Sequence, residues 1–174
     1  MLANLLGQPG ASLRVLDGGC GTGLCGDALR PWASHLIGVD ISSAMLAKAS
    51  QKGNFDELIE SELTQFLQPR TNTFDLIVFA DTLIYFGDLH DILCASAKAL
   101  DQQGSILFNL EASHNKVKTN SYNLHPNGRY THSANYVEKT LRSCGFEQIS
   151  INSDSVRQEI GKPVKGLVVS ARMK

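Results

Sequence analysis

The sequence predicts an α/β fold in which helices cover both faces of a mainly parallel sheet, giving a three-layer sandwich. Short apolar runs alternate along the chain with segments whose apolar residues recur at helical spacing, a pattern typical of strand–helix–strand units. The run at residues 76–79 is apolar throughout, as expected of a strand that is buried on both faces. Two strands expected near the end of the chain have no helix between them, so they should pair antiparallel.

The first half of the chain contains the signals of three strands and two helices. An apolar run closed by Asp17 predicts the first strand, and Pro31 ends the helix that follows because proline cannot continue the backbone hydrogen bonds. Ser42 or Ser43 can cap the second helix. In order, we expect a strand at 13–16, a helix at 23–30, a strand at 36–39, a helix carrying Met45, Leu46 and Ala49 on one face, and a weak strand at 58–61.

The second half predicts four more strands, which completes a seven-stranded, mostly parallel sheet with an antiparallel last strand. Residues 112–132 show no clear period and predict a long loop, although residues 126–128 carry a turn signal. In order, we expect a strand at 74–80, a helix capped by Asp88, a strand at 105–110, the loop, a helix from Ser133 to Cys144 ended by Gly145, and strands at 148–152 and 167–171 joined by a turn near 161–166.

The composition is that of a single globular domain over residues 1–174. Hydrophobic residues make up 43% of the chain and charged residues 19%. The formal net charge of -1 argues against a general nucleic-acid binder, which usually carries a strong basic excess. No apolar run approaches the roughly 18 residues that cross a bilayer, and residues 1–10 lack the basic flank of a secretion signal. We therefore expect a cytoplasmic protein without a membrane partner.

The four cysteines, at positions 20, 25, 94 and 144, contain no C-x-x-C pair. Their spacing suggests neither a zinc site nor a disulfide framework, and a reducing compartment is the simpler location. No pair of histidines has metal-ligand spacing either, so we predict no metal site. Cys20 lies inside a glycine-rich turn, where its small size is a better explanation than redox sensitivity.

The most specific functional signal is this glycine-rich turn, which lies between two acidic strand ends. The first strand ends at Asp17, residues 18–23 include four glycines, and the second strand ends at Asp40. Glycine lets the backbone turn sharply and lets a ligand approach closely. The carboxyl ends of parallel strands line the ligand crevice of such sheets. A carboxylate at the second strand end can accept hydrogen bonds from two ribose hydroxyls.

Two classes of cofactor fit a turn of this kind, and charge favours one of them. Residues 21–26 have the form G-x-G-x-x-G, the fingerprint of dinucleotide binding. A diphosphate prefers a helix N-terminus without nearby anions. Asp17 would oppose a diphosphate and would attract the ammonium group of a methionine moiety. The turn therefore favours S-adenosylmethionine over a dinucleotide, and a purely structural turn would leave both strand-end aspartates unexplained.

Four segments, in this order, resemble motifs of the class I S-adenosylmethionine-dependent methyltransferases. Residues 15–23 resemble the first motif and residues 38–46 the ribose-binding segment. Residues 74–78 resemble the fourth-strand motif, and residues 100–104 resemble the turn before the fifth strand. The resemblance covers most of the chain and implies a Rossmann-like sandwich with S-adenosylmethionine as the cofactor.

A narrower resemblance is to predicted bacterial methyltransferases that often follow tetratricopeptide repeats. It rests on residues 80–88 and 127–133. This chain departs from that group because it contains no repeats. It also departs from the wider family because only about a dozen residues precede the first strand, where members usually have helices that close over the ligand. We therefore expect the N-terminal lid helices to be missing or short.

The resemblance implies roles for particular residues toward the cofactor. Asp17 would face the methionine end, and Asp40 would bind the ribose hydroxyls with Ile41 against the adenine. Met45 would also contact the adenine or, equally, belong to the helix core. Glu62 would lie at the adenine edge. The implied cofactor residues are Asp17, Gly18, Gly19, Cys20, Gly21, Gly23, Asp40, Ile41, Met45, Glu62, Leu63 and Ala80.

Methyl transfer from a sulfonium needs little from a protein beyond aligning the acceptor and excluding water. A base is needed only when the attacking atom must lose a proton. Asp81 either orients the substrate or helps to hold the cofactor, and Tyr85 either lines the pocket or packs. Arg129, in the long loop, can bind a carboxylate or phosphate through a forked pair of hydrogen bonds. The acceptor-side candidates are Asp81, Tyr85, His125, Arg129 and His132.

These signals together predict methyl transfer by in-line attack on the sulfonium methyl. The expected acceptor is a small molecule or, alternatively, a protein side chain, with no nucleic-acid partner. Residues 80–83 lack the Asn-Pro-Pro-Tyr type sequence used for amide or amino nitrogen acceptors. Two other functions stay open: an NAD(P)-dependent oxidoreductase, and a catalytically silent, cofactor-binding subunit of a protein partner.

Overall fold

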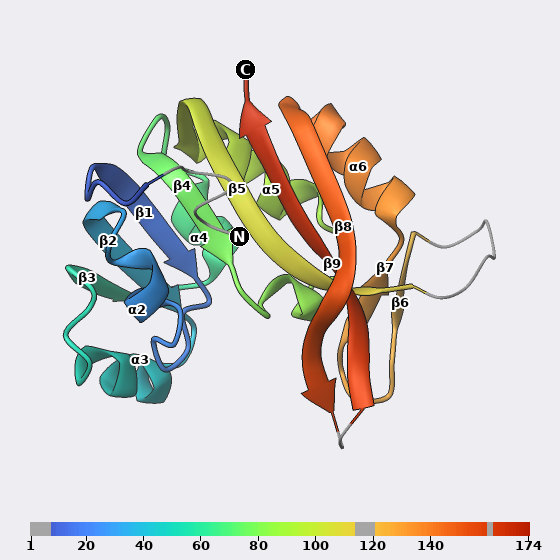
Figure 1. Ribbon diagram of the computed structural model, residues 1–174, viewed down its shortest axis with the longest axis horizontal. Coiled ribbons are helices and arrows are strands. Elements are labelled where there is room, and N and C mark those ends of the chain that lie inside the picture. Colours follow the sequence, from blue (N-terminus) through green and yellow to red (C-terminus); the bar gives the residue numbers. More distant parts are fainter. Residues whose placement is uncertain (1–7, 114–120, 160–161) are drawn as a thin grey trace.

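The computed structural model describes residues 8–113, 121–159 and 162–174, whose strands form one nine-stranded sheet (Figure 1). Five strands run parallel in the order β3-β2-β1-β4-β5. Their bounds are β1 Leu13–Gly18, β2 Ala33–Asp40, β3 Glu57–Glu60, β4 Phe74–Phe79 and β5 Leu100–Ala112. The predicted parallel core is therefore confirmed.

The two final strands form a long antiparallel hairpin that continues the sheet beyond β5. β9, Lys162–Met173, pairs antiparallel with both β5 and β8, Phe146–Glu159. The antiparallel pairing is confirmed, but both strands are longer than predicted and extend past the end of β5 (Figure 1). The turn expected near 161–166 is wrong from Lys162 onward, because residues 162–166 belong to β9. Residues 160–161 lie outside the described part of the chain.

The segment at 112–132 is not the continuous loop that its sequence predicts. It contains the antiparallel hairpin of β6, Tyr122–Leu124, and β7, Tyr130–His132, and β7 adds in parallel to the end of β5. The predicted turn signal at 126–128 marks the tip of this hairpin, where Gly128 has φ +78°. Strands of three residues are too short to show a period of two, which explains the wrong prediction. Residues 114–120 lie outside the described part of the chain.

The helices largely follow the sequence signals. Ser42 and Ser133 cap their helices, because each hydroxyl oxygen accepts a hydrogen bond from a backbone N–H three residues on. The helix expected at 23–30 begins only at Gly26, since residues 20–23 form a turn closed by a hydrogen bond. The helices are α2 Gly26–Leu29, α3 Ser43–Ser50, α4 Leu63–Leu67, α5 His90–Ala99 and α6 Ala134–Ser143, with a short 3-10 turn, η1, at Leu83–Tyr85.

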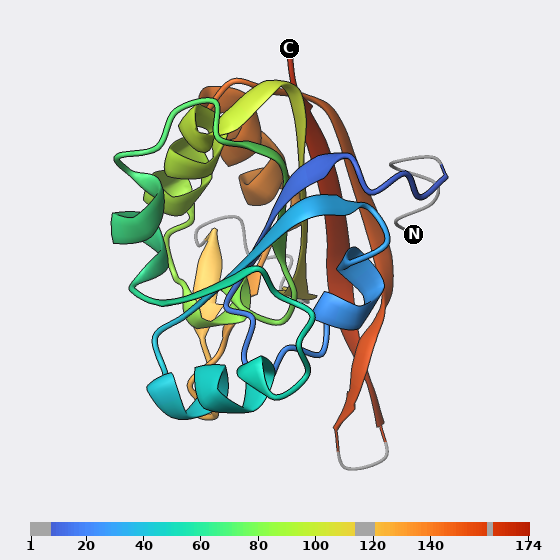
Figure 2. The ribbon, with the colours of Figure 1, turned by 90° about the vertical axis from the view of Figure 1, so that its left-hand side faces the viewer.

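Apolar side chains fill the space on both faces of the sheet. Helices α4, α5 and α6 cover one face, and the short α2 lies against the other (Figure 2). The buried side chains form two cores, and the strands contribute residues to both. In β4, Ile77 belongs to the larger core, whereas Leu76 and Val78 belong to the smaller one. This double burial accounts for the continuous apolar run in β4. In the described ranges, no helix is long and apolar enough to cross a membrane.

One prediction about the cysteines is wrong. Cys94, in α5, and Cys144, at the end of α6, form a disulfide that closes a sequence separation of 50 residues. No local spacing signals this bond, because it depends on the packing of α6 against α5.

Tyr136 makes a second link between α6 and α5. Its hydroxyl accepts a hydrogen bond from the N–H of the buried Leu89 (2.8 Å) and donates one to Asp88 Oδ1 (2.9 Å). Asp88 also accepts a hydrogen bond from the N–H of His90 (2.9 Å). This backbone bond, more than the tyrosine bond, lowers the pKa of Asp88. The start of α5 is therefore fixed from the first turn of α6.

We expect Tyr136→Phe to lower the free energy of unfolding by about 1–3 kcal/mol, because the N–H of Leu89 would lose its acceptor in a buried place. Thermal or denaturant unfolding measures this change. Tyr85→Phe is the matched control: the Tyr85 side chain is 58% exposed, so its unfolding free energy should stay within about 0.5 kcal/mol of the parent. Equal losses in both variants would contradict the role given to Tyr136.

Candidate functional site

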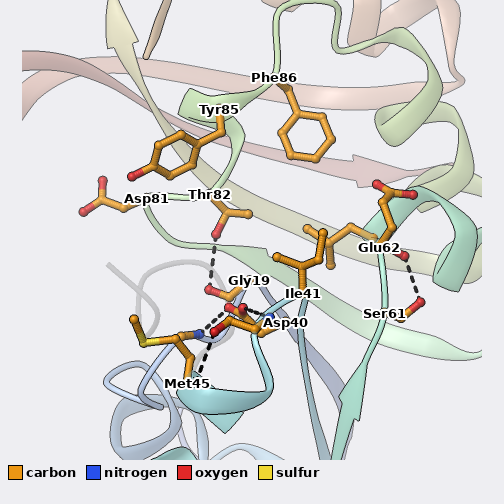
Figure 3. Close-up of a pocket in the computed structure, with 13 residues that line it drawn as sticks. Gly19, Asp40, Ile41, Met45, Ser61, Glu62, Asp81, Thr82, Tyr85 and Phe86 are labelled. Atoms are coloured by element: carbon orange, nitrogen blue, oxygen red, sulfur yellow. Dashed lines mark hydrogen bonds between the residues drawn. The ribbon is translucent and has the colours of Figure 1, made fainter. Parts of the chain in front are cut away.

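A cavity of about 520 Å³ opens at the carboxyl ends of the parallel strands β1–β4 (Figure 3). Ligand sites of open α/β sheets lie at this edge. Figure 3 shows Tyr85 and Phe86 on one wall, Asp40 and Met45 on the opposite wall, and Glu62 to one side. The cavity is lined by Gly19, Gly21, Asp40, Ile41, Ser42, Met45, Ser61, Glu62, Leu63, Asp81, Thr82, Tyr85 and Phe86.

The glycine turn forms the floor of this cavity, and its glycines are needed for different reasons. Gly19 has φ +72°, and a Cβ there would lie 2.4 Å from the side chain of Thr82. Gly21 has φ +53°, but a Cβ would meet nothing within 4 Å. Thr82 in turn donates a hydrogen bond from its hydroxyl to the carbonyl of Gly18 (3.0 Å). Gly19 therefore allows close packing within the protein, whereas Gly21 leaves open space on the cavity side.

Asp40 holds the turn next to the second strand. Its Oδ2 accepts a hydrogen bond from the N–H of Gly21 (2.9 Å), and its Oδ1 accepts one from the N–H of Ser42 (2.9 Å). Each carboxylate oxygen has a second lone pair. Asp40 can therefore keep both backbone bonds and still accept hydrogen bonds from a diol in the cavity that it lines.

Asp17 is the most unusual polar group of the site. It lies one residue before the end of β1 with only 1% of its surface exposed, and neither carboxylate oxygen has a hydrogen-bond partner among the described residues. Burial and, to a smaller extent, the charge of Asp40 together raise the pKa of Asp17 to about 7. Buried polar groups in native proteins nearly always have partners. An unpartnered carboxylate beside a glycine turn is thus suited to a cationic or hydrogen-bond-donating ligand.

Exposed apolar side chains stand around the cavity. Ile41 is 74% exposed and Met45 is 40% exposed, and both line it. The core side of α3 is instead formed by Leu46 and Ala49. Met45 therefore lies on the cavity side of α3 rather than in its core, and its contact with the adenine stays a prediction. A flat ring bound between these side chains would remove them from water.

Glu62 and Leu63 also line the cavity, at the start of α4. The helix itself is not expected from the sequence. The Glu62 carboxylate accepts hydrogen bonds from the N–H groups of Thr64 (2.9 Å) and Gln65 (2.8 Å), so it caps this helix. Leu63 is nearly buried and supplies an apolar surface.

Asp81 lies at the rim of the cavity in a backbone conformation that non-glycine residues rarely adopt, with φ +53°. Asn109 of β5 holds it there. The amide oxygen of Asn109 accepts from the N–H of Asp81 (2.8 Å), and its NH₂ donates to Asp81 Oδ1 (2.5 Å). The role of Asn109 was not predicted from the sequence, because its partner Asp81 lies 28 residues earlier.

The predicted acceptor-side residues are only partly brought together. Asp81 and Tyr85 line the cavity, whereas His125, Arg129 and His132 are not among its lining residues. His132 is fully buried, its Nε2 lies 3.0 Å from the carbonyl oxygen of Gly87, and burial lowers its pKa. His125 Nε2 lies 3.1 Å from the hydroxyl of Thr131, and Arg129 is half-buried at the turn of the β6–β7 hairpin.

Five predicted cofactor residues lie beneath or beside the cavity rather than on its lining: Asp17, Gly18, Cys20, Gly23 and Ala80. Four lining residues were missed: Ser42, Ser61, Thr82 and Phe86. Each directly adjoins a predicted residue, so position next to a strand-end motif was the available signal. Burial raises the pKa of the Cys20 thiol to about 12, which keeps it protonated and agrees with a packing role.

Comparison with known proteins shows the family to which this chain belongs. A family model described as a methyltransferase domain matches residues 16–108, more than half of the chain. The chain therefore belongs to the methyltransferase domain family, and the predicted class is confirmed. The structure of an S-adenosylmethionine-dependent methyltransferase from Mesorhizobium loti has the same fold, with a TM-score of 0.70 and 22% identity over 98% of this chain and 95% of that one.

Curated relatives match shorter stretches. The 18S rRNA (guanine-N(7))-methyltransferase of Bos taurus is 39% identical over 64 residues, covering 37% of this chain and 23% of the relative. The mitochondrial ubiquinone biosynthesis O-methyltransferase of Bos taurus is 24% identical over 107 residues, covering 58% and 29%. The matched part thus spans about a quarter of the length of these relatives. One of them is named for an RNA and the other for a small-molecule pathway.

Proposed function

We propose that this chain binds S-adenosylmethionine in the cavity and transfers its methyl group to a small-molecule acceptor. The observation that carries the proposal is Asp17, whose two buried oxygens lack a partner among the described residues. Asp17 is not on the cavity lining, so the ammonium group of the methionine moiety would supply the missing donor and positive charge either directly or through an ordered water. Asp40 would accept the ribose hydroxyls, and Ile41 and Met45 would cover the adenine ring.

The same residues argue against a dinucleotide. A diphosphate at this turn would lie near the buried carboxylate of Asp17 and would compete with Asp40 for the N–H of Gly21. Two anionic groups in a poorly solvated place repel one another strongly. The membership of the methyltransferase domain family points the same way.

The protein's contribution to the reaction would be placement and dehydration. The bound sulfonium supplies an activated methyl group, and its departure as a neutral thioether needs no acid. Asp81 and Tyr85, at the open side of the cavity, would border the acceptor, and the bonds from Asn109 would keep Asp81 in position. If the attacking atom carries a proton, the Asp81 carboxylate at the rim would be placed to receive it.

A thermal-shift experiment with S-adenosylmethionine, S-adenosylhomocysteine and NAD tests the cofactor assignment. A ligand that binds only the folded state raises the melting temperature. We expect both sulfur ligands to raise it and NAD to leave it unchanged. Release of S-adenosylhomocysteine is then scored on panels of small molecules, proteins and RNA. Turnover on RNA alone would replace the small-molecule acceptor, and tight binding without turnover on all panels would indicate a silent partner subunit.

Cofactor affinity should also depend on pH. Only the ionised form of Asp17 attracts an ammonium group, and the pKa of the free protein's Asp17 is raised to about 7. Binding below pH 7 must therefore release a proton, so affinity should fall by roughly tenfold for each pH unit between 7 and 5. Calorimetry at several pH values measures this slope. An affinity that does not change over this range would separate Asp17 from the ligand.

A further inference from the structure

The disulfide between Cys94 and Cys144 forms a second feature of chemical interest. It joins α5 to the end of α6, both cysteines are half-buried, and neither lines the cavity. The other two thiols, Cys20 and Cys25, are free, and burial raises their pKa to about 12 and about 11. The four sulfurs therefore divide into two protonated thiols near the glycine turn and one oxidised pair between helices.

An imidazole stands beside this disulfide. His90 lies one helical turn before Cys94, and its Nε2 is 3.7 Å from Cys94 Sγ. Its Nδ1 is 3.3 Å from a carboxylate oxygen of Asp91, which orients the ring with Nε2 toward the sulfur. His90 and Asp91 are both exposed, so water reaches the ring. A sulfur next to a proton donor is the better leaving group in thiol–disulfide exchange.

We propose that Cys94 and Cys144 form a reversible redox site that accepts electrons from a dithiol, with His90 assisting the departure of the Cys94 sulfur. A thiolate of the dithiol attacks Cys144 Sγ, the disulfide bond breaks, and its electron pair stays on Cys94 Sγ. This sulfur takes a proton from Nε2 of the imidazolium form of His90, which keeps its Nδ1–H toward Asp91. The second thiolate of the dithiol attacks the mixed disulfide and releases the Cys144 thiolate. The dithiol leaves as its own disulfide, two electrons have passed to the protein, and His90 recovers its proton from water.

Reduction removes a covalent tie but leaves the hydrophobic core in place. Val137 and Leu141 of α6 stay buried against the rest of the larger core, and Tyr136 still bonds to the start of α5. The reduced chain should therefore remain folded. A disulfide that closes about 50 residues restricts the unfolded chain strongly. We expect its reduction to lower the melting temperature by roughly 5–10 °C.

The test uses the full chain, first oxidised with oxidised dithiothreitol and then exposed to dithiothreitol without denaturant. Alkylation in denaturant after each step, followed by mass measurement, should count two free thiols before reduction and four after it. Melting should stay cooperative, at the lower temperature given above. His90→Ala should slow reduction by about threefold. His35→Ala, which removes a histidine paired with Glu57 at the other edge of the sheet, should leave the rate unchanged.

Several results would overturn the proposal. If the two additional thiols appear only when dithiothreitol acts in the presence of denaturant, the bond is a static one. Four thiols after oxidation would mean that the bond does not form. Cys94→Ser should melt at the same temperature in both redox conditions, and a remaining difference would assign the effect to other groups. None of these measurements depends on cofactor binding. The redox proposal can therefore fail while the methyltransferase assignment holds, and the reverse.

Discussion

Asp17→Asn is expected to abolish cofactor binding while making the free protein more stable. The ammonium group of the ligand would lose a buried anionic partner, and removal of one member of a buried charged pair typically costs about 3–5 kcal/mol. We therefore expect affinity for S-adenosylmethionine to fall by at least a hundredfold in calorimetry. The substitution keeps the shape of the side chain, so the loss would come from charge.

The gain in stability follows from the same carboxylate. Burial raises the pKa of Asp17 from its ordinary value of 3.8 to about 7, so between these two values the folded chain holds a proton that the unfolded chain releases. Stability of the free protein therefore decreases as pH rises from about 4 to 7, and the full cost applies above pH 7. Asp17→Asn removes this cost, and we expect about 2 kcal/mol more stability at pH 8 after allowing for a buried amide.

Asp75→Asn provides a control with the opposite sign. Asp75 is bound by Arg14 through two side-chain contacts, of 2.6 and 3.0 Å, and the hydrogen bonds from Arg14 lower its pKa. Its neutralisation should destabilise the fold modestly and leave cofactor affinity unchanged. If Asp17→Asn and Asp75→Asn weaken cofactor binding equally, the special role of Asp17 is refuted.

Gly19→Ala is expected to have the second-largest effect, on both stability and binding. The new Cβ would be built 2.4 Å from the Thr82 side chain, in a backbone conformation of φ +72° that alanine adopts at a cost. We expect the free energy of unfolding to fall by about 2–4 kcal/mol. The floor of the cavity would shift, so cofactor affinity should fall by at least about tenfold. Denaturant unfolding and calorimetry measure the two effects.

Two further variants separate steric clash from backbone strain. Gly21→Ala has a comparable φ of +53° but no atom within 4 Å of the new Cβ, so its stability should fall by only about 1–2 kcal/mol. Thr82→Ala in the Gly19→Ala background should recover part of the lost stability, because it removes the atoms in conflict. A double-mutant cycle gives the coupling energy. A cycle without coupling would show that Thr82 is not the obstacle.

The sequence predicted those parts of the site whose signals are local. Asp17 and Asp40 are visible because each ends a short apolar run, and the parallel sheet follows from alternation along the chain. The helix caps at Ser42 and Ser133 were also readable, since a cap and its helix are adjacent. These features need no knowledge of which distant segments meet.

Several of the missed features depend on distant pairing. The short strand β7 pairs with β6 and also with the end of β5, which lies earlier in the chain. The disulfide requires α6 to pack on α5, and the bond between Asn109 and Asp81 requires the register of β5 against β4. Glu62 shows a different limit: its place beside the cavity was expected, but its carboxylate is used to cap α4.

Asn109 has a consequence for how this domain can be altered. The family match ends at residue 108, so the side chain that fixes Asp81 lies one position beyond the shared segment. Asn109 belongs to β5, which pairs antiparallel with the final strand, β9. A chimera that carried only residues 16–108 would therefore keep the glycine turn but lose the two hydrogen bonds from Asn109 that fix Asp81. A substitution at Asn109 can thus alter the rim of the cavity at Asp81 without touching the glycine turn.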